Sequence, residues 1–158
     1  MRRQILDAAR ARLATDGASG LSLRAVARDV GLVSSAVYRY VPSRDALLTE
    51  LIIEAYDAMA DAAEALEAPV PRERTRQRWV AVCTAVWRWG VARPNEWALI
   101  HGSPVPGYAA PRDTVRAAAR MPTLLITVLN DAAVAGTRLP ASSLDRQVQA
   151  ALAPIRAQ

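Results

Sequence analysis

One stretch near the N-terminus, Leu23–Val41, constrains the fold of this chain more than any other part of the sequence. It contains two short helical patterns joined by Gly31. A helix-turn-helix needs a small residue where its helices cross, then a residue that tolerates positive φ, then an apolar residue that packs back. Ala27, Gly31 and Val37 provide these features in that order. The stretch therefore predicts a helix-turn-helix in which Gly31 has a positive φ.

The second helix of this pattern has a polar and basic outer face. Val37 and Tyr40 form its inner face, which leaves serine, tyrosine and arginine side chains pointing outwards. A helix that enters the major groove of DNA presents a face of this kind. We expect base edges or the nearby backbone to be contacted by Ser34, Ser35, Tyr38 and Arg39, and phosphates by Arg24, Tyr40 and Arg44.

The rest of the chain contains helical patterns and no strand pattern, so we predict an all-α fold. The first helix covers residues 3–16 and stops at Gly17, and Ser22 caps the next one. Ser43 caps a long helix that ends near Glu67. Its inward face is predicted to consist of Leu48, Leu51, Ala55, Met59, Ala62 and Leu66.

Prolines and glycines divide the second half into shorter helices. Helical spacing covers Trp79 to Trp89, and one or two turns cover residues 94–100. His101–Gly107 is too rich in proline and glycine for a regular helix and predicts a loop. Two further helices are predicted over 113–135, with a kink at Pro122, and over 143–156.

Charge is distributed unevenly along the chain. All 20 basic residues are arginines. Residues 1–48 hold eight of them against four acids, whereas residues 49–68 hold six acids and no base. Such an asymmetry would turn a basic N-terminal face toward phosphates. The alternatives are that arginine usage reflects a GC-rich coding background and that the acidic helix face is simply solvated.

Length and composition fit a small cytoplasmic protein. The chain has 158 residues, 52% of them hydrophobic, which is enough to bury a core. No apolar run approaches the roughly 20 residues of a membrane-spanning helix, and Met1–Arg3 leads into an amphipathic pattern rather than a secretory signal. Cys83 is the only cysteine and cannot form an internal disulfide. We expect no membrane association.

Several segments between residues 5 and 48 match one family pattern without a gap: Ile5–Ala9, Gly17, Leu21–Ala27, Gly31, Ala36–Tyr40 and Pro42–Leu48. The region resembles the N-terminal domain of the tetracycline-repressor-like (TetR) regulators. The sequence departs from the common pattern at Val33 and Ser34, where a capping serine and then a basic residue or threonine are more usual. The resemblance implies a three-helix DNA-binding head over residues 1–47, joined by the long helix to a body over residues 48–158.

A second resemblance lies in the body. Trp97–Tyr108 is similar to the C-terminal domain of one subset of TetR-like proteins, which contains tryptophan, histidine and glycine at these positions. In that family this half binds a small effector and forms the dimer, so the resemblance implies a homodimer. The chain departs from the family because no further long apolar helix follows Leu139 before the terminal pattern over 145–155.

Few side chains suit catalysis or metal binding. His101 is the only histidine and Cys83 has no spaced cysteine partner, so we expect no metal site and no cofactor. Ser103 lies near His101, but no strand precedes it and no glycines flank it as in a serine nucleophile turn. We therefore predict that the protein is not an enzyme. His101 is expected to fix the loop through hydrogen bonds or to face a ligand.

Four tryptophans and no phenylalanine occur in the chain. Tryptophans at helical spacing generally pack into a core, but they also line apolar ligand pockets. The prolines and glycines near residues 94–107 prevent tight helix closure, so a gap is expected there. We predict an effector pocket lined by Trp79, Cys83, Val86, Trp97, His101, Tyr108, Leu125 and Val128.

These observations predict a DNA-binding transcriptional regulator. The partners would be a double-stranded DNA operator, a small hydrophobic or aromatic effector and a second copy of the chain. A ligand that shifts the long helix would change the separation of two heads, so we expect a repressor that the effector releases. The alternative is a DNA-binding protein that has no small-molecule effector and is regulated by a protein partner.

Overall fold

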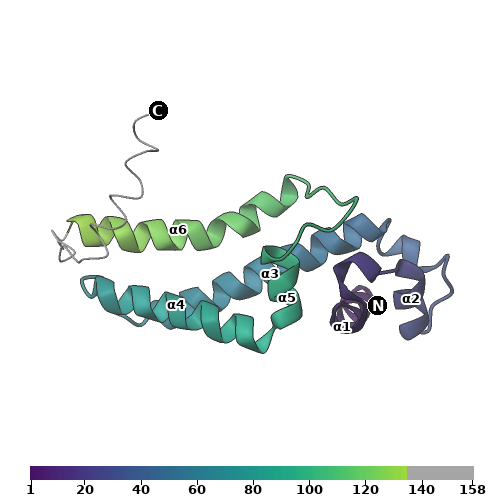
Figure 1. Cartoon of the computed structure of the whole chain (residues 1–158), viewed down its shortest axis with the longest axis horizontal. Helices are drawn as coiled ribbons and strands as arrows, with labels where there is room; N and C mark the ends of the chain where they lie inside the picture. The colour runs from purple at the N-terminus through teal and green to yellow at the C-terminus, as the bar shows by residue number, and fades with distance from the viewer. Residues whose placement is uncertain (135–158) are drawn as a thin grey trace.

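The computed structural model describes residues 1–134 and is helical throughout that part of the chain (Figure 1). The predicted helix over 143–156 lies outside the described residues. The elements are α1 (Arg2–Gly20), α2 (Leu23–Asp29), a single 3-10 turn (Val37–Arg39), α3 (Arg44–Glu67), α4 (Thr75–Ala92), α5 (Pro94–His101) and α6 (Asp113–Val134). The prediction of an all-α fold is confirmed, and none of these helices is long and apolar enough to cross a membrane.

The N-terminal helices pack on the first turns of α3 and form a separate head at one end of the molecule (Figure 1). Ile5, Ala9 and Leu13, which are spaced four residues apart on one face of α1, are buried. They meet the buried side chains of the other head elements, which are Val26, Val37, Val41, Leu47, Leu48 and Leu51. The first helix breaks at Gly17, whose φ of 66° is outside the helical range, and one more turn follows it.

The helix-turn-helix geometry around Gly31 is confirmed. Gly31 has a φ of 70°, and Ala27 and Val37 are completely buried. Residues after Val33 differ from the prediction, because they form turns and one 3-10 turn rather than a regular second helix. The Ala36 amide donates to the Val33 carbonyl at 2.8 Å, which is a turn hydrogen bond. Valine offers no side-chain oxygen to cap an α-helix there.

The long helix α3 begins and ends where the sequence predicted. The Ser43 hydroxyl accepts a hydrogen bond from the Ala46 amide at 3.0 Å, and the helix ends at Glu67. Most of the predicted inward face is buried, but Leu66 is 36% exposed. In the last turns the buried face consists of Ala60 and Ala63 instead, since these small residues let the neighbouring helices approach closely.

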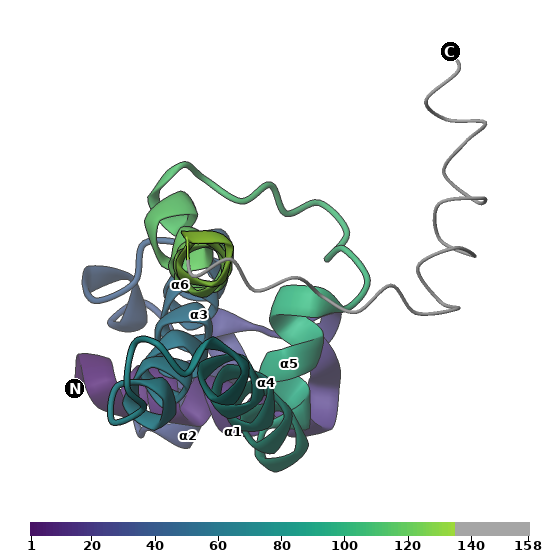
Figure 2. The same ribbon diagram turned by 90° about the vertical axis from the view of Figure 1, so that its left-hand side faces the viewer.

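The body consists of α3, α4 and α6, which lie side by side along the long axis (Figures 1 and 2). Their shared core contains Met59, Val82, Trp89 and Met121. The short helix α5 leads back to the head, and in Figure 2 the segment after it arches away before it reaches α6. Helix α6 continues through Pro122, which lies on its exposed side.

Candidate functional site

The recognition segment, defined here as residues 33–40, presents most of its polar side chains to solvent. Ser34, Ser35 and Arg39 are exposed, and the Tyr38 side chain is 48% exposed. Tyr40 is half-buried and packs against the head core. The structure thus brings four of the predicted DNA-contacting residues onto one short exposed segment, with Tyr40 partly withdrawn beneath it.

Ion pairs occupy four of the arginines in the head. Arg2 pairs with Glu50 at 2.7 Å, and Arg3 and Arg10 pair with acids of α1 and α3. Arg12 pairs with Asp29 at 2.5 Å and with Asp16 at 2.8 Å. The hydrogen bonds from Arg12 hold the pKa of Asp29 below its ordinary value. The positive charges of Arg2, Arg3, Arg10 and Arg12 are therefore largely neutralised within the molecule.

Three exposed arginines of the head remain outside these pairs. Within residues 1–134, Arg24, Arg28 and Arg39 take part in no ion pair. Arg24 and Arg28 are one helical turn apart on α2, and Arg39 lies in the recognition segment that follows. The positive field of the head is therefore concentrated on the helix-turn-helix, where Arg28 adds a charge that we did not predict as a contact.

Arg44 has a different environment from the one we expected. Its guanidinium donates to the backbone carbonyls of Ala18, Ser19 and Leu21 at 3.0, 3.1 and 3.0 Å. These hydrogen bonds use Nε and Nη2, whereas Nη1 lies 3.7 Å from Asp45 Oδ1. Arg44 thus ties the end of α1 to the start of α3, and the phosphate contact predicted for it stays a prediction.

A cleft of about 550 Å³ opens between α3, α5 and α6 beneath the segment that follows α5. No charged side chain lines it. Three of its four hydroxyl groups already make hydrogen bonds: Tyr56 donates to the Ile100 carbonyl at 3.2 Å, Thr114 donates to the Pro111 carbonyl at 2.8 Å, and Tyr108 shares a hydrogen bond of 2.9 Å with Thr49. Ser103 contributes the fourth hydroxyl. The walls otherwise consist of aliphatic side chains and backbone, including Ile52, Leu99, Val105, Val115 and Ala118. Such a lining favours an apolar ligand.

The residues predicted to line one pocket do not lie together. Tyr108 lines the cleft, whereas Val86 and Trp97 line a smaller groove of about 260 Å³ between α4 and α5. His101 contacts the rings of Trp97 and Tyr56, with ring centroids 4.4 and 6.2 Å away, and this partial burial lowers its pKa. Leu125 and Val128 pack toward the body interior. The gap predicted near the proline-rich segment exists as the cleft described above. Its wall opposite that segment is α3 rather than α4.

The tryptophans were expected chiefly in the core, and only Trp89 is there. Trp89 is 3% exposed, whereas Trp79, Trp87 and Trp97 are 39%, 66% and 38% exposed. Trp79 and Cys83 lie on the outer side of α4, away from the cleft. Gly90 explains the position of Trp97, because a Cβ at residue 90 would lie 2.9 Å from its ring. Among the described residues there is no cluster of potential metal ligands.

The sequence matches two family descriptions that together cover most of the chain. Residues 5–51 match "Bacterial regulatory proteins, tetR family", and residues 79–154 match "Tetracyclin repressor-like, C-terminal domain". A relative from Mycobacterium tuberculosis, the HTH-type transcriptional regulator Rv1816, is 44% identical over 133 residues, which are 84% of this chain. The chain spans 56% of the length of that relative.

Solved structures agree with the fold. A protein with unknown function from Rhodococcus sp. RHA1 is 29% identical and superposes with a TM-score of 0.75 over 88% of this chain and 71% of that one. The TetR family transcriptional regulator PfmR from Thermus thermophilus is 16% identical, with a TM-score of 0.69 over 88% and 75% of the two chains. The second similarity concerns the fold alone.

Proposed function

Because this chain belongs to the tetR family of bacterial regulatory proteins, whose members bind DNA and regulate transcription, we propose that it is a repressor that a small apolar effector releases from its operator. In this proposal Ser34, Ser35, Tyr38 and Arg39 contact bases or the adjacent backbone, and Arg24 contacts phosphates together with Arg28. The concentration of the head's unpaired arginines on the helix-turn-helix is the observation that supports this DNA-binding face.

The apolar cleft supports the effector half of the proposal. It has a volume suited to a small molecule and lies between α5 and the long helix α3, whose first turns belong to the head core. A ligand that spreads these helices would tilt the head. In a homodimer, such a tilt would change the distance between two heads that must match half-sites about 34–36 Å apart. An effector that binds the spread form more tightly lowers operator affinity.

The first experiment selects a binding duplex from a random library and measures its affinity in salt titrations. We expect Arg39→Ala to relax sequence preference, because base contacts carry specificity. Arg24→Ala should weaken binding to all duplexes and reduce the salt slope by about one, because phosphate contacts release counterions. Equal losses on every duplex for both variants would contradict this division of roles.

The second experiment screens apolar, aromatic and charged small compounds by thermal shift and then tests hits for release of the duplex. Ala118→Trp fills the cleft and should abolish the response to a hit. Ile126→Trp places the same side chain at an exposed position on α6 outside the cleft and should keep the response. A response that survives Ala118→Trp would place the effector elsewhere.

A second candidate function rests on the outer side of α4. Exposed apolar side chains recur there over more than three turns, at Trp79, Val80, Cys83, Trp87 and Val91. Exposed apolar surface of this extent is typical of protein contact sites. This candidate is a DNA-binding regulator without an effector that responds to a protein partner. It predicts that Trp87→Ser leaves duplex affinity unchanged and abolishes regulation, whereas no compound shifts the melting temperature.

A further inference from the structure

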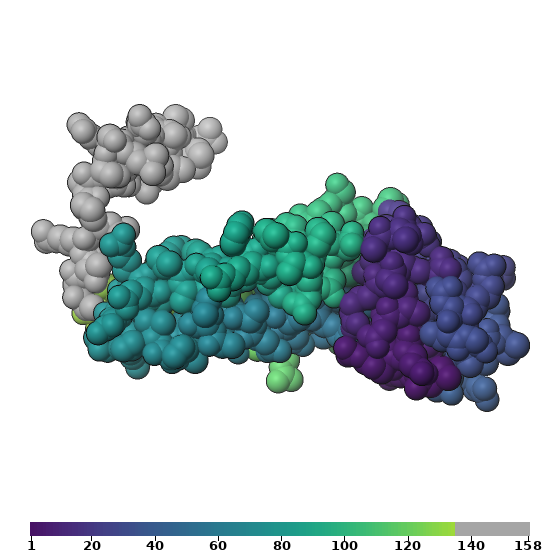
Figure 3. Space-filling view, turned by 90° about the horizontal axis from the view of Figure 1, so that it is seen from below, coloured from purple at the N-terminus to yellow at the C-terminus, as the bar shows by residue number. Residues whose placement is uncertain are grey.

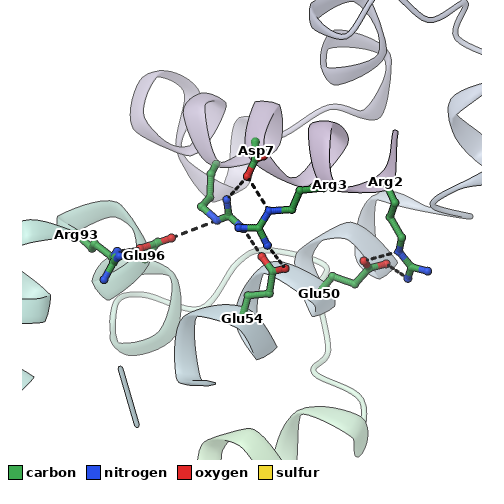
Figure 4. A network of polar contacts seen from close by, with 8 residues as sticks. Arg2, Arg3, Asp7, Glu50, Glu54, Arg93 and Glu96 are labelled. Atoms are coloured by element: carbon green, nitrogen blue, oxygen red, sulfur yellow. Dashed lines mark hydrogen bonds and ion pairs between the residues drawn. The ribbon is translucent and has the colours of Figure 1, made fainter. Parts of the chain in front are cut away.

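One arginine of the head, Arg10, makes ion pairs with acids of two helices outside the head, α3 and α5. Figure 4 shows its partners Asp7, Glu54 and Glu96 close together. The Arg10 guanidinium, on α1, donates to Glu54 of α3, and its Nε lies 3.3 Å from Glu96 Oε1 of α5. Its third contact is with Asp7 of its own helix, at 2.6 Å. Glu96 is held in turn by Arg93, with 3.2 Å between Arg93 Nε and Glu96 Oε2. Arg10 therefore joins three helices through one side chain.

The ion pairs of Arg10 are less exposed than the other ion pairs that link α1 to α3. The Arg10 and Glu96 side chains are 25% and 17% exposed, whereas Arg2 and Arg3 are 63% and 69% exposed. Partly buried pairs are screened less by salt than exposed ones. Figure 3 shows the same contact as α1, in purple, lying directly against the teal-green segment of α5.

Two of the three carboxylates that Arg10 contacts, Glu54 and Glu96, belong to helices that form walls of the cleft. Glu96 precedes the lining residues Leu99 and Ile100 by about one turn of α5. Glu54 lies between the lining residues Ile52 and Tyr56 of α3. Since α5 has only eight residues, a displacement of its cleft end also moves Glu96. A change in the width of the cleft that moves α5 relative to α3 would therefore also change the distance between Glu54 and Glu96.

We propose that Arg10 is a positioning residue that senses this width: it keeps the head in one orientation only while Glu54 and Glu96 are close enough to share its guanidinium. Spreading of the cleft separates the two carboxylates, and Arg10 then follows one of them and carries α1 with it. The inference rests on the proposed function, because it assigns a residue to the coupling between the cleft and the DNA-binding head.

In the test, a tryptophan side chain placed in the cleft takes the place of the unidentified effector. Ala118→Trp, which fills the cleft from α6, is combined with Arg10→Ala or with Glu96→Gln, and the full chain is titrated with the selected DNA duplex. Arg3→Ala is the matched control, because Arg3 pairs with Asp7 and Glu54 but not with α5. Circular dichroism and melting temperatures verify that each variant is folded, and Glu96→Gln keeps the side-chain shape if Arg10→Ala destabilises the head.

We expect Ala118→Trp to weaken duplex binding by about tenfold in the otherwise unchanged chain and in Arg3→Ala, but by less than about threefold in Arg10→Ala and in Glu96→Gln. The same tenfold loss in all four backgrounds would overturn the role of Arg10 and leave the cleft proposal standing. No loss in any background would overturn both, because the cleft would then not communicate with the head. Arg10→Lys should behave like Arg10→Ala, since a lysine keeps the charge but not the planar fork that contacts two carboxylates.

Discussion

Replacement of Arg44 by alanine should destabilise the head and leave the salt dependence of DNA binding by the head unchanged. The guanidinium makes three hydrogen bonds to backbone carbonyls, at 3.0, 3.0 and 3.1 Å. A hydrogen bond from a charged donor contributes about 1.5–3 kcal/mol, but the side chain is 31% exposed and water can replace part of these bonds. We expect a net loss of about 2 kcal/mol in the free energy of opening the head.

Hydrogen exchange measures this quantity in each helix. A loss of about 2 kcal/mol accelerates the exchange of protected amides in α1 and α2 about 30-fold, whereas amides of α4 keep their rates. Arg39→Ala is the control, because Arg39 makes no ion pair or side-chain hydrogen bond within the described residues. The reasoning is refuted if Arg44→Ala leaves exchange unchanged and instead lowers the salt slope of duplex binding by about one, as loss of a phosphate contact would.

Three further substitutions test the local geometry of the head. Gly31→Val forces a β-branched residue to a φ of 70° and should cost more than about 1 kcal/mol, measured as loss of duplex binding while α4 and α6 stay folded. Ser43→Ala removes the cap of α3 and should lower the unfolding free energy by about 1 kcal/mol in urea. Asp29 has a lowered pKa, so its pairing with Arg12 stabilises the head above the carboxyl's ordinary pKa of about 4 and is lost as pH falls further. Asp29→Asn should remove this part of the acid dependence of the melting temperature.

The head could be predicted from the sequence because short-range rules decide its turns. The left-handed backbone at Gly31, the small residue Ala27 at the helix crossing and the cap at Ser43 each depend on a few neighbouring residues. The recognition segment differed from the prediction for an equally local reason. Val33 supplies no capping oxygen, and the chain forms turn hydrogen bonds in place of a first helical turn.

The cleft could not be assigned from the sequence beyond the presence of a gap. Its walls combine α3 with α5, α6 and the segment between them, which lie more than 25 residues further along the chain. Helical spacing alone does not decide which face of α5 turns toward α3. Gly90 is a local signal in the sequence that bears on this choice. It lets Trp97 pack against α4, which draws the tryptophan side of α5 away from the cleft and leaves Leu99 and Ile100 to line it.

The same limit applies to the charges. The sequence indicates a basic head, yet its eight arginines have three different roles that only packing separates. Those that face acids of α1, α2 or α3 hold helices together, and Arg44 holds backbone carbonyls. The ones left exposed on α2 and the recognition segment supply the field that DNA would meet. Counterion release scales with the number of phosphates that a protein neutralises. The salt dependence of duplex binding should therefore correspond to about three phosphate contacts per chain, from Arg24, Arg28 and Arg39, and not to all eight arginines of the head.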